Sequence, residues 1–139
     1  MDISPITIKT TIQAPIDRVW KMWNNPADVI EWNSPSKEWH TPKAENNLAE
    51  GQTFTYTMAA RDGSMSFDFS GTYTLINENE RIEYALADGR NVSVGFSGDG
   101  HTTEIIETFD PENQNPREMQ QAGWQSILDN FRDYAERNA

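Results

Sequence analysis

The residue types that bind metals or act as nucleophiles are scarce in this sequence. It has two histidines, His40 and His101, and no cysteine. A zinc site needs several histidine, cysteine or carboxylate ligands at recurrent spacing. His101 follows the turn sequence "GDG", which is expected to leave it at a strand end in water, and the sequence has no glycine-rich phosphate loop or nucleophile elbow. We therefore expect no metal site and no cofactor.

Carboxylates and tyrosines remain as candidates for acid–base chemistry. Glu104 and Glu107 are three residues apart in a predicted strand, so they face opposite ways and cannot act as a pair without a bulge. Tyr56, Tyr73 and Tyr84 fall on the apolar face of their predicted strands. Each hydroxyl there either orients a ligand or bonds to the backbone. The pattern assigns no catalytic residue, and an enzyme of the cyclase or hydratase type remains an alternative.

The elements that position these groups begin with one strand and two short helices. Ile6, Ile8 and Ile12 alternate with polar residues, which predicts the strand. Apolar residues at helical spacing after Pro15 predict the first short helix. The segment "NNPADVIEW" predicts a second short helix that starts near Pro26.

From residue 37 to residue 109 the apolar residues recur with a period of two. Turn sequences of the Asp-Gly type separate these short alternating segments, and the pattern predicts an antiparallel meander. Tyr73 and Leu75 are both placed on the apolar face of one strand. Gly71 falls on the same face, where it could mark a bulge or a bend.

The segment from residue 115 onward predicts a long terminal helix, because its apolar residues recur at i, i+3, i+4 and i+7. Asn115 is expected to cap this helix and Pro116 to occupy its first position. Gly123 lies inside it, where glycine costs roughly 1 kcal/mol relative to alanine. The glycine therefore indicates either close packing on a strand or room for a ligand.

The predicted sheet is too wide for one helix to cover while it stays flat. Six or seven strands at about 4.8 Å spacing span close to 30 Å, whereas a helix with its side chains is roughly 10 Å across. The sheet must therefore curl around the helix, with the two short helices at one end. Such an arrangement leaves either an apolar pocket or a core filled by aromatic rings.

Length and charge narrow the class of protein further. The chain has 139 residues, which suits one domain over residues 1–139 without disulfides. Its formal net charge of -11 argues against nucleic acid and anionic membranes as partners. The sequence has no apolar run of membrane-spanning length and no signal-peptide pattern in "MDISPITIKT". We expect a cytoplasmic protein that is a monomer or a weak dimer.

Motifs spread over nearly the whole chain match one family in their order and spacing. They are "IQAPIDRVWKMWNNPADVIEW", "NNLAEGQTFTYTM", "DGSMSFDFSGTY", "RIEYALADGRNVSVGFS", "TTEIIETFD" and "GWQSILDNFRDYAE". With these motifs the chain resembles the bacterial family of activator of heat-shock-protein-90 ATPase homologues, within the START and birch-pollen-allergen superfamily. It departs from the family where a usual double glycine is Gly51-Gln52.

The resemblance implies an α+β helix-grip (START-like) fold. In this fold a curved antiparallel sheet of six to seven strands wraps around one long C-terminal helix, and two short helices follow the first strand. The resemblance also implies a hydrophobic cavity between the long helix and the sheet. We therefore predict a protein that binds a small apolar, lipid-like or aromatic molecule. A chaperone partner, with a role in the stress response, is the alternative that the family's name implies.

Large side chains on the inward faces are predicted to line this cavity. They are Trp32, Trp39, Phe54, Tyr56, Phe69, Tyr73, Tyr84, Phe96, Trp124, Leu128 and Phe131. Two of them flank the loop sequence "WNSPSKEWH". Trp32 and Trp39 either seal the end of the cavity as core residues, or one of them lines its entrance with His40 beside it.

Overall fold

The computed structural model describes residues 3–139, which form seven strands and three helices. Their order is β1 (Ile6–Ile12), α1 (Ile16–Asn24), α2 (Pro26–Trp32), β2 (Trp39–Asn46), β3 (Thr53–Ala60), β4 (Ser66–Asn77), β5 (Arg81–Leu86), β6 (Asn91–Gly98), β7 (Thr103–Phe109) and α3 (Arg117–Arg137). All strands join one antiparallel sheet in the order β1-β7-β6-β5-β4-β3-β2. This is the predicted α+β helix-grip arrangement.

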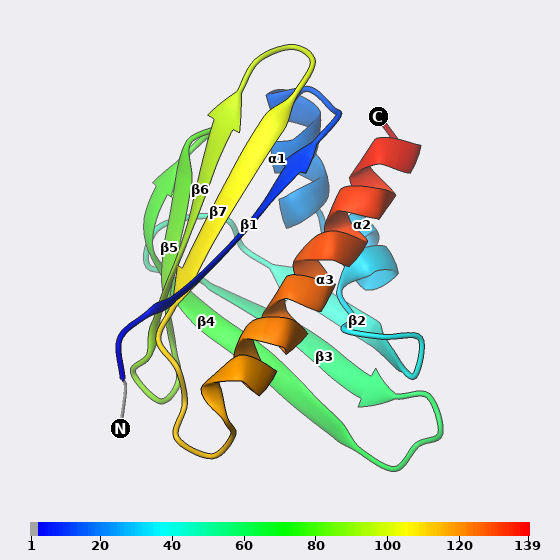
Figure 1. Ribbon diagram of the computed structural model, residues 1–139, viewed down its shortest axis with the longest axis vertical. Helices are drawn as coiled ribbons and strands as arrows, with labels where there is room; N and C mark the ends of the chain where they lie inside the picture. Colours follow the sequence, from blue (N-terminus) through cyan, green and yellow to red (C-terminus); the bar gives the residue numbers. More distant parts are fainter. Residues whose placement is uncertain (1–2) are drawn as a thin grey trace.

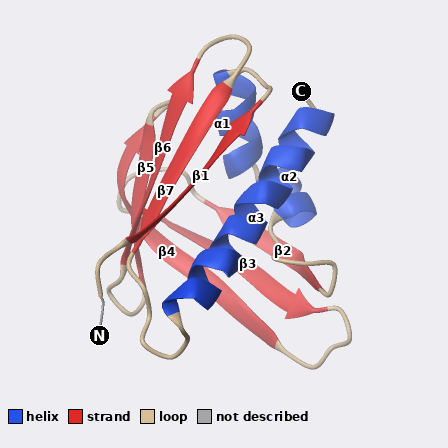
Figure 2. Ribbon diagram, viewed as in Figure 1, coloured by secondary structure: helices blue, strands red, loops and turns tan. Residues whose placement is uncertain are grey.

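The sheet curls around α3, as Figures 1 and 2 show. Helix α3 crosses the concave side, and α1 and α2 lie at the end of the sheet near the C-terminus. The closest backbone approach of α3 to the sheet is to β1, while α2 packs on β2. The helix therefore covers one side of the curled sheet closely and leaves β3, β4 and β5 at a greater distance.

Alternating burial along the strands explains why the sheet has one covered face. In β1, every second residue from Ile6 to Ile12 is buried and the residues between them are exposed. The same alternation runs through β6 and β7. Burial of the apolar face is the main favourable term for such a sheet, whose other face stays in water. The strand at residues 6–12 and the meander predicted from the sequence are both confirmed.

Strand β4 departs from the predicted alternation. Its pairing with β5 shifts register between Tyr73 and Leu75, so Leu75 does not continue the inward row and Ile76 packs against the core instead. The irregularity follows Gly71 rather than lying at it. A methyl group on Gly71 would lie 2.7 Å from Cε1 of Phe54 and 2.9 Å from Cδ2 of Tyr84, so the glycine allows these two rings to pack against the strand.

The helix boundaries lie close to the predicted ones. Pro26 occupies the first turn of α2, and Asn25 caps that helix by accepting a hydrogen bond from the Ala27 N–H at 3.2 Å. For α3 the predicted cap was one residue too early. Pro116 is the N-cap residue, because its carbonyl accepts from the Gln120 N–H, and Asn115 lies before the helix.

The C-terminal half of α3 completes the core. Leu128, Phe131 and Ala135 are buried against β1 and the two short helices. Phe131 lies edge-on to the rings of Trp23 and Trp32, with centroids 4.9 and 4.8 Å apart. Within residues 3–139 we find no helix with both the length and the apolar composition needed to cross a membrane.

Candidate functional site

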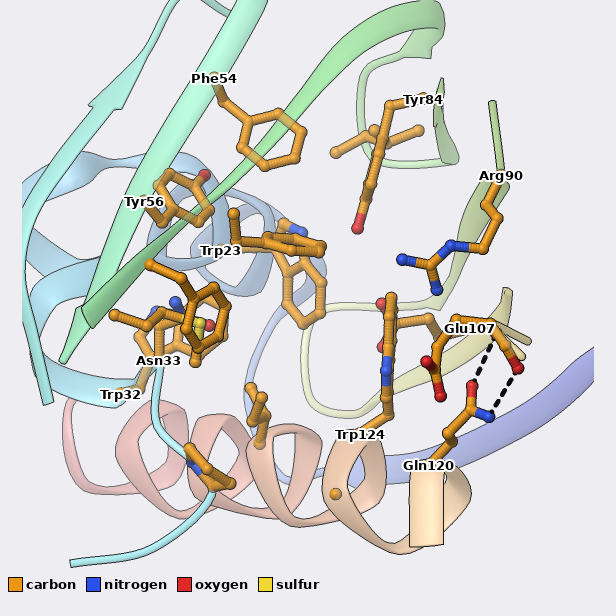
Figure 3. Close-up of a pocket in the computed structure, with 18 of the residues that line it drawn as sticks. Trp23, Trp32, Asn33, Phe54, Tyr56, Tyr84, Arg90, Glu107, Gln120 and Trp124 are labelled. Atoms are coloured by element: carbon orange, nitrogen blue, oxygen red, sulfur yellow. Dashed lines mark hydrogen bonds between the residues drawn. The ribbon is translucent and has the colours of Figure 1, made fainter. Parts of the chain in front are cut away.

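A pocket of about 460 Å³ lies between the N-terminal half of α3 and the part of the sheet that α3 does not approach closely. Strands β3, β4 and β5 form one wall, and Gln120, Gly123, Trp124 and Ile127 of α3 form the opposite one. Side chains from α1, α2 and β7 close its ends. Figure 3 shows these groups converging on one space.

Aromatic rings make up most of the pocket wall. On the sheet side, Phe54 packs against Tyr56, Phe69 and Tyr84 at centroid distances of 4.9, 5.7 and 4.9 Å. On the helix side, Trp124 stacks on Phe109 of β7 with centroids 3.9 Å apart and ring planes 8° from parallel. These ring-to-ring contacts fix the positions of the rings. The ring faces and edges that remain uncovered line a preformed apolar space.

The pocket tyrosines differ in how their hydroxyls are bonded. Tyr73 donates a hydrogen bond to Oδ1 of Asn46 at 2.6 Å, and burial raises the pKa of Tyr73 to about 12. Burial, followed by the nearby Glu107, raises the pKa of Tyr84 well above its usual value. No described residue hydrogen-bonds to the Tyr84 hydroxyl, which points into the pocket in Figure 3.

Glu107 is the unusual group in this wall. It lies on β7 between the buried residues Ile105 and Phe109, and only 6% of its surface is exposed. No described residue forms a hydrogen bond or ion pair with its carboxyl group. Burial raises the pKa of Glu107 to about 8, so the protonated, uncharged form of the group predominates at neutral pH.

The polar end of the pocket is built by the connection from β7 to α3. The amide of Gln120 accepts from the Glu112 N–H at 2.9 Å and donates to the carbonyls of Glu112 at 3.0 Å and Asn115 at 2.9 Å. Figure 3 shows two of these bonds. Because Gln120 is itself buried, the bonds fix this connection to the helix.

Arg90 lies at the same end, in the turn between β5 and β6. Its Nε donates to Oδ2 of Asp88 at 2.8 Å, and hydrogen bonds from Arg90 hold the pKa of that carboxyl below its usual range. Its Nη1 also approaches the Asp110 carbonyl at 3.5 Å. The guanidinium therefore already has one partner in its own turn and one just after β7.

Gly123 opens the helix side of the pocket. A methyl group at this position would meet no atom within 4 Å, so close packing on a strand does not require the glycine. Of the two interpretations drawn from the sequence, the structure favours open space. A side chain here would project into the pocket that Gly123 lines.

The predicted cavity-lining residues fall into two groups. The pocket wall includes Trp32, Phe54, Tyr56, Phe69, Tyr73, Tyr84 and Trp124. Phe96, Leu128 and Phe131 lie in the core where α3, α1 and the sheet pack closely, and Trp39 lies at the start of β2. Contact of any of these residues with a ligand stays a prediction.

Trp32 and Trp39, which flank the loop after α2, occupy different environments. Trp32 is buried at the pocket wall, and its indole N–H donates to the Met22 carbonyl at 3.0 Å. Trp39 is half-buried and lies edge-on to Phe67, with centroids 5.9 Å apart. Phe67 in turn belongs to the pocket wall and is 46% exposed, so this ring pair lies where the pocket meets solvent.

The two histidines do not converge with other ligands. His40 is half-buried on β2, and His101 is exposed in the turn between β6 and β7. Within residues 3–139, the side chains of histidine, aspartate and glutamate form no group of three or more that could hold a metal ion.

Sequence reasoning omitted Glu107 and Trp23 from the predicted wall. The signal for Glu107 was present, because Ile105, Glu107 and Phe109 are spaced by two and must share a face of β7. Trp23 belongs to the predicted helical stripe of Ile16, Val19, Trp20 and Trp23. Arg90 carried no such signal, because turn geometry brings it to the pocket.

A family model described as "Activator of Hsp90 ATPase homolog 1-like protein" matches residues 13–136. The solution NMR structure of an AHSA1-like protein from Aeromonas hydrophila is 42% identical to the chain, with a TM-score of 0.89 over 96% of this chain and 93% of that one.

Two further solved structures extend the comparison. A protein from Cytophaga hutchinsonii is 54% identical, with a TM-score of 0.82 over 96% of this chain and 92% of that one. A protein from Nitrosomonas europaea shares the fold at 15% identity, with a TM-score of 0.82 over 97% and 96% of the two chains. The comparison with functionally curated proteins gave no significant match.

Proposed function

This chain belongs to the family of activator of Hsp90 ATPase homolog 1-like proteins, and on that premise we propose that it binds a small apolar molecule. The ligand would be aromatic or lipid-like and would occupy the pocket between α3 and strands β3 to β5. The observation that carries the proposal is the ring-lined space of about 460 Å³.

The size and composition of the pocket support this function. Ligand pockets in proteins commonly measure roughly 300–1,000 Å³ and combine apolar walls with a few polar groups. Protein interiors are otherwise close-packed, and cavities lower stability in proportion to their volume. A core that served stability alone would gain from a larger side chain at Gly123, where a methyl group would meet no atom.

Filling the pocket from the helix side tests the proposal. Gly123→Leu places an aliphatic side chain in the space, whereas Ala122→Leu adds the same chemistry at an exposed position of the same helix. We expect Nile red, an uncharged apolar fluorescent probe, to bind the wild type and Ala122→Leu equally, and Gly123→Leu about tenfold more weakly. Equal binding by all three proteins would contradict binding in this pocket.

Interaction with a chaperone ATPase is the second candidate function, and the description of the family is the observation that favours it. Such an interaction would use an exposed surface rather than the pocket. The test is the ATP hydrolysis rate of a bacterial Hsp90-type chaperone with and without this protein. An unchanged rate at saturating protein concentration would count against this candidate.

A further inference from the structure

Glu107 places a carboxyl group on the pocket wall, and no described residue pairs with it. The described side chains include no fully enclosed nitrogen or oxygen atom that lacks a hydrogen bond. Since Glu107 is buried and unpaired, its carboxyl oxygens must face the open space of the pocket. A buried carboxyl group without a partner lowers stability, so the stability of the fold does not explain a glutamate at this position.

Within residues 3–139, no ion pair joins a cationic side chain to this carboxyl group. Arg90 is the cationic residue at the wall, and its guanidinium is bonded to Asp88 and to the Asp110 carbonyl. The other ionisable groups there are Glu112 and the tyrosines. Glu112 accepts hydrogen bonds from the backbone N–H groups of Gln114 and Asn115, so it adds a second acidic group near the pocket.

The surroundings of Glu107 favour a positive group in the space in front of it. Figure 3 shows Glu107 at the end of the pocket where Trp124 also lies, and the Tyr84 hydroxyl points toward the same space. Aromatic faces attract cations, and the attraction is stronger where water is excluded. The formal net charge of -11 adds a field that draws cations and repels anions.

We propose that the pocket selects a ligand that combines a ring-containing apolar body with an amino group, and that the amino group, as an ammonium ion, pairs with the Glu107 carboxylate. The proposal rests on the proposed function of ligand binding and names the class of ligand. The proton balance is simple. An amine that enters uncharged takes the proton of Glu107, and one that enters as an ammonium ion leaves that proton to solvent.

Three probes with the same ring system separate this ligand class from others. They are naphthylethylamine, naphthylethanol and naphthylacetate, which carry a cationic, a neutral and an anionic group. Isothermal titration calorimetry at neutral pH measures their affinities. We expect the amine to bind about tenfold or more tightly than the alcohol, because a hydrogen bond between charged groups exceeds one between neutral groups. The acid should bind more weakly than both.

Two variants on one strand then assign the preference to a residue. Glu107→Gln removes the carboxylate from the pocket, while Glu104→Gln removes the same charge from the exposed side of β7. We expect Glu107→Gln to abolish the preference for the amine and to leave the alcohol affinity within about threefold. Glu104→Gln should behave like the wild type, because a distant surface charge is screened by salt.

The outcomes distinguish this inference from the proposed function. If the alcohol binds as tightly as the amine, or the acid binds best, ligand binding stands and the amine inference is overturned. Equal loss of amine affinity in Glu107→Gln and Glu104→Gln would also overturn it, because overall charge would then explain the preference. If none of the three probes binds, both the inference and the proposed function fail.

Discussion

Glu104 and Glu107 project from opposite faces of β7, so that one carboxyl group lies in solvent and the other lies at the pocket wall. The spacing of three residues dictates this arrangement in a regular strand. The pair therefore offers a matched comparison, because the same amide substitution can be made at both positions of one element.

The first prediction concerns stability against pH. The pKa of Glu107 is raised from 4.5 to about 8 in the folded state, so between these values the folded state binds more protons than the unfolded state. Glu107 therefore makes the free energy of unfolding fall as pH rises through this window, by up to about 1.4 kcal/mol per pH unit. The stability that protonated Glu107 contributes is fully present below pH 4.5 and is lost above about pH 8.

Glu107→Gln removes that titration, so its stability relative to the wild type should rise steadily from about pH 5 to about pH 8 and then level off. The pocket tyrosines and Glu112 do not titrate there, because the pKa values of Tyr56, Tyr73 and Tyr84 are raised and that of Glu112 is lowered. Urea unfolding at several pH values measures the difference. Glu104→Gln should show no such trend, and a trend of the same size in both variants would contradict the assignment.

The second prediction separates the two tryptophans that flank the loop. Trp32→Ala removes a buried ring and its hydrogen bond to Met22, so it should lower the free energy of unfolding by about 3–5 kcal/mol. Trp39→Ala removes a half-buried ring that contacts Phe67, so it should cost about 1 kcal/mol. Its larger effect should be on the rate of probe uptake, because Phe67 lies at the pocket wall. Thermal unfolding and stopped-flow fluorescence measure the two quantities.

The third prediction concerns Gly71. A methyl group there would lie 2.7 Å from a ring atom of Phe54, so Gly71→Ala must displace that ring or the strand. We expect a loss of about 1–3 kcal/mol in the free energy of unfolding. Gly100→Ala is the control, because a methyl group at Gly100 would meet no atom within 4 Å. Urea unfolding that finds the two variants equally stable would show that Phe54 does not need the glycine.

The fourth prediction is a gain of stability at Gly123. Alanine there should strengthen α3 by about 1 kcal/mol, because it has the higher helix propensity and its methyl group meets no other atom. The same methyl group narrows the pocket, so probe affinity should fall while stability rises. Chemical unfolding measures the stability, and titration of the same preparation with the probe measures the affinity. A loss of stability would show that the helix backbone needs glycine at this position.

The fold was largely readable from the sequence because its elements follow simple periods. The isoleucines of β1 alternate in sequence and in burial, and Pro26 marks the start of α2 in both. The inward row of β4 was predicted wrongly at Leu75, because a register shift depends on pairing with β5 rather than on local composition. The α3 cap was wrong by one residue, a typical uncertainty of helix ends.

The candidate site was only partly readable. Residues such as Tyr56 and Trp124 were identified as inward-facing, since periodicity defines faces. Periodicity does not show which inward-facing residues line a pocket and which pack fully against other side chains. It therefore could not distinguish Phe54, which lines the pocket, from Phe131, which does not. That distinction depends on where α3 lies on the curled sheet, close to β1 and away from β3, β4 and β5.

The most direct test of ligand binding between α3 and strands β3 to β5 locates a bound probe within the protein. Nuclear Overhauser effects between naphthylethylamine and the protein report groups in contact with the ring. Binding in the pocket predicts contacts to Trp124 and Ile127 of α3 and to Phe54 of β3, which face one another across the pocket. Contacts confined to exposed apolar residues such as Met119 and Ile106, with none to the pocket wall, would contradict it.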